Sequence, residues 1–449
     1  MIELSPQRIA AAMGATIVAE GGDGFPARAA IDSREAGGGL FFGLRGESAD
    51  GGEFAATALG DGAWGAVVAP ARSAGLEGGW VFAAEDPLLA LGALAREWRR
   101  ALGAPVVGIT GSVGKTSVKD VIRALLPGRV HASPENFNTE IGLPLAVLSA
   151  PAGTETLVLE MAMRGAGQIA ELAQIAKPDV AVITSIGPVH VELLGSVEAI
   201  AAVKAEILAD LPAGGAAVVP VDAPLLEPHL AAVPRLLRFG EGGDVAVLES
   251  KTQGGATEAL IGTPAGSQRF AFPFDEAYNL TNALAAIAVG VALGSSPAAM
   301  AERAPAIGFS RLRGERLELG DGVTLVNDSY NANPVSMRAA LDHLATLEAS
   351  RRIAVLGEMA ELGSGAPAFH REVGEHARSR GIDFLVGVGE AARDYGPDEL
   401  VATPTDAAEL LAPQLCPGEV VLVKGSRAAG LEEVAEALGD LLAAEVEEG

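Results

Sequence analysis

Residues 105–117 read Pro-Val-Val-Gly-Ile-Thr-Gly-Ser-Val-Gly-Lys-Thr-Ser, and this stretch decides how the chain folds. A short β-branched run, Val106–Thr110, ends in a glycine-rich turn, and we expect a helix from Val118 to Leu126. This order is typical of a phosphate loop, because backbone N–H groups and a helix N-terminus bind a polyphosphate. Lys115 would supply charge near the β- and γ-phosphates, and the Thr116 hydroxyl would reach Mg²⁺.

The phosphate loop departs from the usual spacing at one position. Ile109 stands where a glycine is usual, so the match is to the variant Thr-Gly-Ser-x-Gly-Lys-Thr. A chance glycine–lysine turn is the alternative, and the flanking strand and helix disfavour it. The expected nucleotide-binding residues are Gly111, Ser112, Val113, Gly114, Lys115, Thr116 and Ser117.

Length and composition limit the class of protein. The 449 residues suggest three domains at roughly 150 residues each. A net charge of −26 disfavours a nucleic-acid partner, which needs a basic face. The single cysteine, Cys416, permits no internal disulfide and favours a reducing compartment. The longest apolar run, Ala283–Gly294, is shorter than the roughly 20 residues of a membrane span, and no signal peptide is recognisable, so we expect a cytoplasmic protein.

Residues 1–83 are expected to form a small N-terminal α/β domain. Its predicted elements are a helix at 6–13, a strand at 40–44, a helix near 53–60 and a strand at 65–69. Asp32-Ser33-Arg34 lies among glycine-rich turns, and taken alone it favours an ordinary turn with a solvated arginine.

Residues 84–312 are expected to form a central α/β domain, after a helix from Asp86 to about Leu102. Three predicted strands, 106–110, 156–160 and 180–184, lead to Lys115, Glu160 and His190. Alternating strands and helices favour a mostly parallel sheet, whose ligands collect at the carboxyl ends of the strands. We therefore expect Lys115, Glu160 and His190 at one edge. Glu160 is interpreted as a Mg²⁺ ligand rather than a carboxylate paired with an arginine. His190 remains either a metal-site residue or an ordinary loop histidine.

Lys204 interrupts an apolar face of the helix predicted from Ser196 to about Leu211. The apolar positions are Ile200, Val203, Ile207, Leu208 and Leu211. A lysine within this stripe either extends to the edge of the helix or has a reason to be buried. One such reason is a carbamate formed with CO₂, which would be an anionic Mg²⁺ ligand.

Polar residues recur further along the chain. Asn279 and Asn282 share a face near the start of a helix at 278–293, where they either cap the helix or bind a base edge. Arg311, Arg313 and Arg316 form a basic cluster, interpreted as a phosphate site or as a solvated rim. Residues 313–449 are expected to form a third domain with strands near 323–327, 352–356, 383–388 and 420–423, whose sheet faces the nucleotide site.

Seven segments, in order and over nearly the whole chain, resemble the muramyl ligase family of bacterial cell-wall synthesis. They are 110–117 at the phosphate loop, Asn136–Pro144, Leu159–Met161, Ile183–Glu192, Val203–Ile207, Asn279–Asn282 and Val423–Arg427. Within that family, Asp328–Pro334 and Leu356–Gly363 are similar to members that add D-alanyl-D-alanine to a UDP-muramyl-tripeptide. The Asp-Asn-Pro-Arg type motif of members that add the third amino acid is absent.

The resemblance implies three domains: a small N-terminal α/β domain for the UDP-sugar, a central P-loop ATPase-like domain and a C-terminal Rossmann-like domain. It also implies ATP and Mg²⁺, with two metal ions expected, and two small-molecule substrates, the UDP-muramyl-tripeptide and D-alanyl-D-alanine. The substrate carboxylate would attack the γ-phosphate, and the dipeptide amine would then displace phosphate from the acyl phosphate. We also expect a monomer.

The resemblance assigns roles to single residues. It implies Lys115, Glu160, His190 and Lys204 for catalysis, with Thr116, Glu160, His190 and carbamylated Lys204 at the metal. It implies Asn279, Asn282, Arg313 and Asp328 for the nucleotide. It implies Ser33, Arg34, Asn138 and Thr139 for the UDP-muramyl substrate, and Tyr330, Asn331 and Asn333, beside Asp328, where the nucleotide and the dipeptide meet.

Two positions depart from the family, and other functions compete with this one. Tyr278 stands where a histidine is common, and Asn327 where an aspartate is common. A folylpolyglutamate-type ligase, a diaminopimelate-adding ligase and a P-loop switch or motor are the rivals. A switch typically ends the second strand in aspartate, whereas this strand ends in Glu160.

Overall fold

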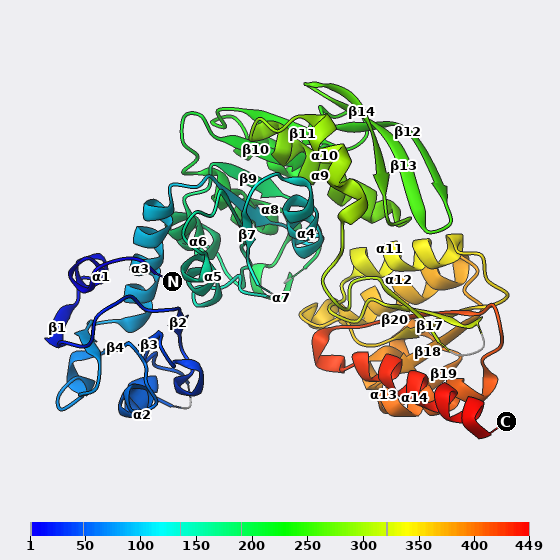
Figure 1. The fold of residues 1–449 in the computed structure, drawn as a ribbon. Coiled ribbons are helices and arrows are strands. Elements are labelled where there is room, and N and C mark those ends of the chain that lie inside the picture. Colours follow the sequence, from blue (N-terminus) through cyan, green and yellow to red (C-terminus); the bar gives the residue numbers. More distant parts are fainter. Residues whose placement is uncertain (1, 48, 135, 190, 320–321, 449) are drawn as a thin grey trace.

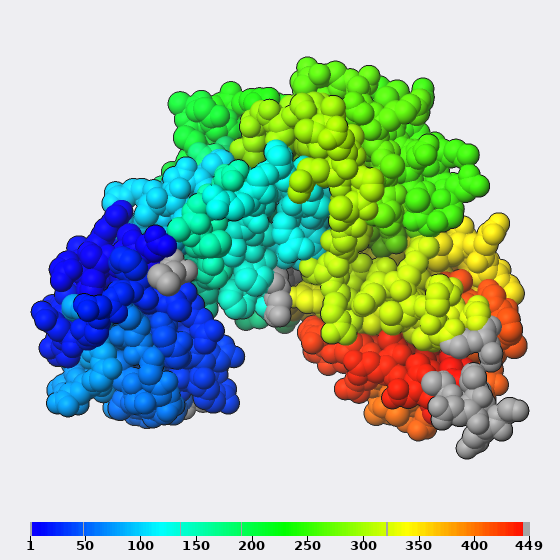
Figure 2. All heavy atoms as spheres, in the orientation of Figure 1, coloured from blue at the N-terminus to red at the C-terminus, as the bar shows by residue number. Residues whose placement is uncertain are grey.

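The computed structural model describes residues 2–47, 49–134, 136–189, 191–319 and 322–448. The chain forms three lobes in sequence order (Figure 1). The N-terminal and C-terminal lobes both lie on one side of the central lobe, and Figure 2 shows an open hollow between them. The expected three-domain α/β architecture is therefore confirmed.

The N-terminal lobe contains a five-stranded sheet in the order β1-β5-β4-β3-β2, in which only β1 runs antiparallel. Its elements are α1 Pro6–Met13, β1 Thr16–Ala19, β2 Ala29–Ala30, β3 Leu40–Phe42, α2 Ala55–Gly60, β4 Gly65–Val68 and β5 Trp80–Ala83. Both predicted helices and both predicted strands are present. The strands β1, β2 and β5 are additional to the prediction.

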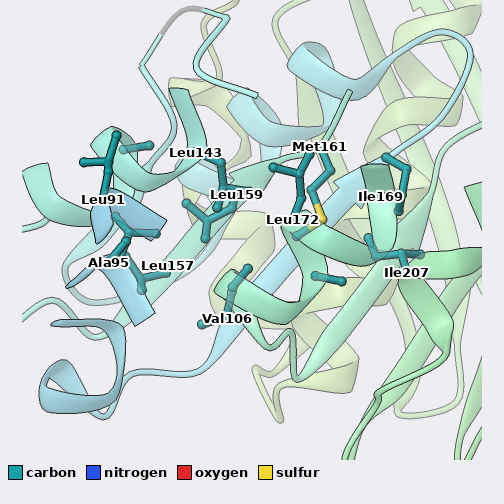
Figure 3. Close-up of a cluster of buried hydrophobic side chains, with 14 of the residues drawn as sticks. Leu91, Ala95, Val106, Leu143, Leu157, Leu159, Met161, Ile169, Leu172 and Ile207 are labelled. Carbon is teal, nitrogen blue, oxygen red and sulfur yellow. The ribbon is translucent and has the colours of Figure 1, made fainter. Parts of the chain in front are cut away.

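Helix α3, Pro87–Leu102, joins the N-terminal lobe to the central lobe. Asp86 caps its first turn by accepting from the N–H groups of Leu88 and Leu89, and Gly103 ends it in a left-handed conformation. Its apolar face, with Leu91 and Ala95, packs in one core with Leu143 and Leu157 of the central lobe (Figure 3). The same core extends to the N-terminal sheet, so α3 fixes the two lobes to each other.

The central lobe is built on a six-stranded, wholly parallel sheet in the order β11-β10-β9-β6-β8-β7. Its strands are β6 Val106–Thr110, β7 Val130–Ala132, β8 Thr156–Glu160, β9 Val180–Ile183, β10 Ala216–Pro220 and β11 Leu236–Phe239. A three-stranded antiparallel sheet follows: β12 Ala246–Gln253, β13 Ala256–Thr263 and β14 Gly266–Phe272. Because β6 lies between β8 and β9, the ends of the three strands that were expected to carry chemistry are adjacent.

Helices cover both faces of the parallel sheet. They are α4 Lys115–Leu125, α5 Gly142–Ser149, α6 Gln168–Ala176, α7 Val191–Leu194, α8 Val197–Ala205, α9 Ala277–Ala292 and α10 Pro297–Arg303. One core contains residues of α3, α5, α6 and α8, and a second contains residues of α4, α9 and α10. The predicted helix over 196–211 is therefore shorter, because a 3₁₀ turn at Glu206–Leu208 follows α8.

The C-terminal lobe has a six-stranded sheet in the order β15-β16-β20-β17-β18-β19, with only the edge strand β15 antiparallel. Its strands are β15 Glu315–Glu318, β16 Thr324–Asn327, β17 Arg352–Leu356, β18 Phe384–Val388, β19 Glu399–Val401 and β20 Val420–Lys424. Helices α11 Pro334–Thr346 and α12 Ala366–Ser379 cover one face, and α13 Pro404–Leu411 and α14 Glu432–Glu448 cover the other. The four predicted strands are present, and β15 and β19 are additional.

The loop after β9 contacts the C-terminal lobe. A Cβ atom added at Gly187 would lie 3.1 Å from Cγ2 of Val335 at the start of α11. A Cβ atom added at Gly363 would lie 3.0 Å from Cβ of Glu192. The carboxyl edge of the central sheet therefore meets the C-terminal domain directly. None of the helices in the described part of the chain is long and apolar enough to cross a lipid bilayer.

Candidate nucleotide and catalytic site

The phosphate loop connects β6 to α4 through two glycines with positive φ angles, Gly111 at 152° and Gly114 at 88°. A Cβ atom on Gly111 would lie 1.9 Å from Oγ1 of Thr184, so this close approach requires glycine. Helix α4 begins at Lys115, three residues earlier than predicted, with Gly114 as its N-cap. The lysine therefore stands at the positive end of the helix.

The segment after β9 holds the loop in place. Ser112 N–H donates to the Ser185 carbonyl at 3.0 Å, and Val113 N–H donates to Ser185 Oγ at 2.9 Å. The Ser112 hydroxyl donates to the Gly187 carbonyl at 3.1 Å and accepts from Gly187 N–H at 2.9 Å. The Thr184 hydroxyl donates to the Val113 carbonyl. Thr184 and Ser185 were not predicted as site residues, although their place at the end of β9, beside β6, could have indicated them.

The Lys115 amine lies inside the phosphate loop and donates to the Gly111 carbonyl at 2.9 Å. Burial lowers the pKa of Lys115, the Glu160 carboxylate raises it in part, and the Arg313 guanidinium lowers it further. These influences show that Lys115, Glu160 and Arg313 share one environment. The three residues lie, in that order, on the phosphate loop, on the adjacent strand and in the segment that leads into the C-terminal domain.

Glu160 ends β8 and is only 1% exposed. Its Oε2 accepts from the Thr116 hydroxyl at 3.3 Å, and its Oε1 lies 3.3 Å from the Lys119 amine. Its backbone N–H donates to Ser133 Oγ at 3.2 Å. Glu160 thus faces the phosphate loop as predicted, and its paired cation is a lysine rather than an arginine. Lys119 was not predicted, because a lysine on a helix is usually solvated.

Lys204 is 3% exposed, so the interpretation that it extends into solvent is wrong. Burial holds the pKa of Lys204 well below its usual range, and the positive charge of Lys115 lowers it further. No described carboxylate lies within ion-pair distance of its amine. The structure therefore brings Lys204 into the same charged environment as Lys115, as the sequence predicted. His190 lies outside the described residues.

Asn279 and Asn282 form a hydrogen-bonded series on α9. Asn282 Nδ2 donates to Asn279 Oδ1 at 3.2 Å, and Asn279 Nδ2 donates to Glu276 Oε2 at 3.2 Å. The interpretation of these asparagines as helix caps is therefore wrong. A Cβ atom on Gly114 would lie 2.6 Å from Asn282 Oδ1, so this series reaches the phosphate loop.

The three arginines of the basic cluster differ in their environments. The Arg313 guanidinium lies 4.1 Å above the Tyr330 ring, and its buried Nε has no hydrogen-bond partner among the described residues. Arg316 is paired with Asp275 and its side chain is 33% exposed. Arg311 is exposed. Of the cluster, only Arg313 lies close enough to influence Lys115.

Lys424 organises the polar residues after β16. Although its side chain is buried, its amine donates to Asp328 Oδ2 at 2.6 Å, to the Asp328 carbonyl at 3.3 Å and to the Asn331 carbonyl at 3.0 Å. Asn333 Oδ1 caps α11 by accepting from two backbone N–H groups, so the structure gives this residue a capping role. Asn327 Oδ1 accepts from both the N–H and the hydroxyl of Ser329, as an aspartate at this position could also do.

The residues expected at the UDP-muramyl substrate lie apart from the phosphate loop. Ser33 and Arg34 belong to a 3₁₀ turn on the N-terminal lobe, where Arg34 is exposed and paired with Asp32. The ordinary-turn interpretation accounts for all of these contacts. Asn138 accepts from Ala162 N–H through its carbonyl, and Thr139 Oγ1 accepts from Gly142 N–H at 3.3 Å, at the start of α5.

A phosphate loop on a parallel sheet, with a buried glutamate and two buried lysines beside it, defines a nucleotide-binding α/β enzyme. Residues 109–290 match the Mur ligase middle domain, and residues 312–427 match the Mur ligase, glutamate ligase domain. The chain is 38% identical to the UDP-N-acetylmuramoyl-tripeptide–D-alanyl-D-alanine ligase of Mycobacterium bovis, over 98% of each chain. The chain belongs to the Mur ligase family.

Two solved structures support this assignment. MurF from Acinetobacter baumannii is 27% identical and superposes with a TM-score of 0.89 over 97% of this chain and 98% of that chain. MurF ligase from Thermotoga maritima in complex with ADP is 31% identical, with a TM-score of 0.84 over 93% of this chain and 98% of that chain. The likeness thus includes all three domains.

Proposed function

We propose that this chain is an ADP-forming ligase that joins D-alanyl-D-alanine to UDP-N-acetylmuramoyl-tripeptide with ATP as the energy source. The names of its relatives support this function. The observation that carries it is the meeting of two groups of residues. Lys115 shares one charged environment with Glu160, Lys204 and Arg313, and the loop after β9 contacts the C-terminal domain, where Lys424 orders the loop at Asp328.

The reaction requires two anions to approach each other. The tripeptide carboxylate attacks the γ-phosphorus of ATP, the bond to the β-phosphate oxygen breaks, and an acyl phosphate and ADP form. The dipeptide amine then attacks the acyl carbon, loses a proton and expels inorganic phosphate. Lys115 at the N-terminus of α4 stabilises the charge on the transferred phosphoryl group, which is the main catalytic demand of such a transfer.

Magnesium fits the residues beside the loop. Glu160 Oε1 is buried, pairs with the Lys119 amine and accepts no hydrogen bond from the described residues, and the Thr116 hydroxyl lies beside the other oxygen of the same carboxylate. Oxygen donors of this kind suit a hard divalent cation. Thr116 would hold one Mg²⁺, and Glu160 and His190, with carbamylated Lys204, a second. When bound, the metal neutralises phosphate charge.

Each domain is proposed to bind one of the three ligands. The domains span residues 1–83, 84–312 and 313–449, and bind in turn the UDP-sugar, the nucleotide and the incoming dipeptide. Ser33, Arg34, Asn138 and Thr139 contact the UDP-muramyl substrate. Arg313 and Asp328 contact the nucleotide, and Tyr330, Asn331 and Asn333 lie near the dipeptide. The protein acts in the cytoplasm as a monomer. Light scattering of the purified chain would test the monomeric state.

Release of phosphate from ATP tests the function. The assay contains ATP, UDP-N-acetylmuramoyl-tripeptide and D-alanyl-D-alanine, with each omitted in turn, and mass spectrometry identifies the product. We expect release only with all three, and a pentapeptide product. Lys115→Met should abolish release. Release at the same rate without the dipeptide, or with diaminopimelate or glutamate in its place, would contradict the proposal.

A further inference from the structure

A cluster of charges, shielded from solvent except for the Arg316 side chain, which is 33% exposed, joins the central domain to the C-terminal domain. Asp275 and Glu276 precede α9, Arg316 lies on β15 and His343 lies on α11. Arg316 is paired with Asp275, and its Nη2 lies 3.8 Å from Glu276 Oε1 and 3.0 Å from His343 Nε2. His343 Nε2 lies 3.6 Å from Asp275 Oδ1 and 3.7 Å from Glu276 Oε1. Both carboxylates and the imidazole are almost wholly shielded from solvent.

Two adjacent buried carboxylates need a compensating positive charge. The ligand atoms of Asp275, Glu276 and His343 lie within 4.8 Å of one another, as a metal site would require. The Arg316 guanidinium lies beside both carboxylates, however, so the chain itself supplies a positive charge that offsets one of the two negative charges. Because that guanidinium belongs to the other domain, separating the domains would break both ion pairs and would have to be compensated by hydration of the freed charges.

Glu276 also connects this cluster to the phosphate loop. Its Oε2 accepts from Asn279, Asn279 accepts from Asn282, and Asn282 Oδ1 is the atom beside Gly114. Each amide is thereby oriented by the next, beginning at the carboxylate. A shift of Glu276 would therefore change how Asn282 faces the loop.

We propose that Asp275, Glu276, Arg316 and His343 form an interdomain latch, and that Glu276 couples this latch to nucleotide affinity through Asn279 and Asn282. The coupling rests on the proposed function, because it takes these asparagines as nucleotide contacts. Binding energies are reciprocal in such a system. If the closed latch favours the nucleotide, the bound nucleotide favours the closed latch to the same extent.

The environment of His343 defines its state in the latch. It is faced by Asp275 and Glu276, by Arg316, by Asp328 after β16 and by the Tyr278 ring edge on α9. Since Arg316 can only donate, His343 Nε2 accepts, and the imidazole is neutral with its proton on Nδ1. Burial lowers the pKa of His343, which is consistent with this neutral form.

Arg316→Met tests the latch. Small-angle X-ray scattering with and without the ATP analogue AMP-PNP and Mg²⁺ reports domain separation, and calorimetry gives the dissociation constant of AMP-PNP. Arg269→Met is the matched control, because Arg269 is an exposed arginine of the central domain paired with Glu249 at 2.8 Å. We expect Arg316→Met to have a larger radius of gyration and an affinity for AMP-PNP at least about fivefold weaker. Values equal to those of Arg269→Met would overturn the latch.

A double-mutant cycle tests the coupling to the asparagines. If Glu276 transmits the latch state, the change in the AMP-PNP dissociation constant of the double mutant differs from the product of the changes in Arg316→Met and Asn279→Ala by a factor of about three or more. Additive effects would overturn the proposed coupling. If Arg316→Met does not fold, Arg316→Lys, which keeps the charge but not the planar geometry, replaces it in both experiments. Scattering and nucleotide binding can be measured without catalytic turnover. Failure of the ligase assay in the unmodified protein would therefore contradict the proposed function and is distinguishable from failure of the latch.

Discussion

Lys119 provides a direct test of the charge balance beside the phosphate loop. Its side chain is 3% exposed, and its amine lies 3.3 Å from Glu160 Oε1 and 3.8 Å from Asp120 Oδ1, while it donates to the Ser133 carbonyl at 3.0 Å. Lys119→Met keeps most of the volume and removes the charge. Glu160 would then retain the hydrogen bond from Thr116 and the electrostatic interaction with Lys115.

The size of the effect follows from these contacts. Removing one partner of a buried ion pair costs about 3–5 kcal/mol of unfolding free energy. Asp120 adds little to this loss, because its Oδ2 still accepts from the N–H and hydroxyl of Ser310. For a domain of this size each kcal/mol lowers the melting temperature by about 2–4 °C, so Lys119→Met should lower the central-domain transition by roughly 6–20 °C.

Differential scanning calorimetry measures this transition, with Lys251→Met as the control because Lys251 is an exposed lysine on β12. Lys251→Met should leave the transition unchanged. Millimolar Mg²⁺ should restore part of the loss in Lys119→Met, because a divalent ion at Glu160 supplies the missing positive charge. A Lys119→Met transition equal to that of the control, with no response to Mg²⁺, would refute this reasoning.

Three further predictions concern the loop, the buried lysine and the latch. Gly114→Ala should weaken AMP-PNP binding at least about tenfold, because the added Cβ meets an asparagine oxygen at 2.6 Å; Gly167→Ala, with a similar φ of 85° but open space around it, should bind normally in calorimetry. Lys204→Met should abolish ligase activity, and bicarbonate should not restore it; wild-type rates would exclude a catalytic role. AMP-PNP affinity should fall as the pH drops below about 6.5. The reason is that packing lowers the pKa of His343, so protonation of the imidazole opposes the packed state. The affinity of His343→Gln should be much less sensitive to pH.

The sequence alone determined the phosphate loop, the parallel strands around it and the residues at the strand ends. Gly111, Gly114 and Lys115 follow a β-branched run, and this local pattern needs no tertiary contact to be recognised. Glu160 could be predicted for the same reason, because parallel strands bring their carboxyl ends to one edge. The position of Lys204 within an apolar stripe indicated that it would be unusual.

Only the tertiary structure decided which charges are paired. In the sequence Lys119 looks like an ordinary lysine on a helix. Its pairing with Glu160 arises only because the neighbouring strand places that carboxylate beside it. Arg316 and Arg313 look alike in the sequence, yet Arg316 on β15 is paired with Asp275, whereas Arg313, just before this strand, lies close enough to influence Lys115. These pairs form between residues that are far apart in the chain. What a charged side chain does therefore depends on the charges of its neighbours in space and on how deeply the pair is buried.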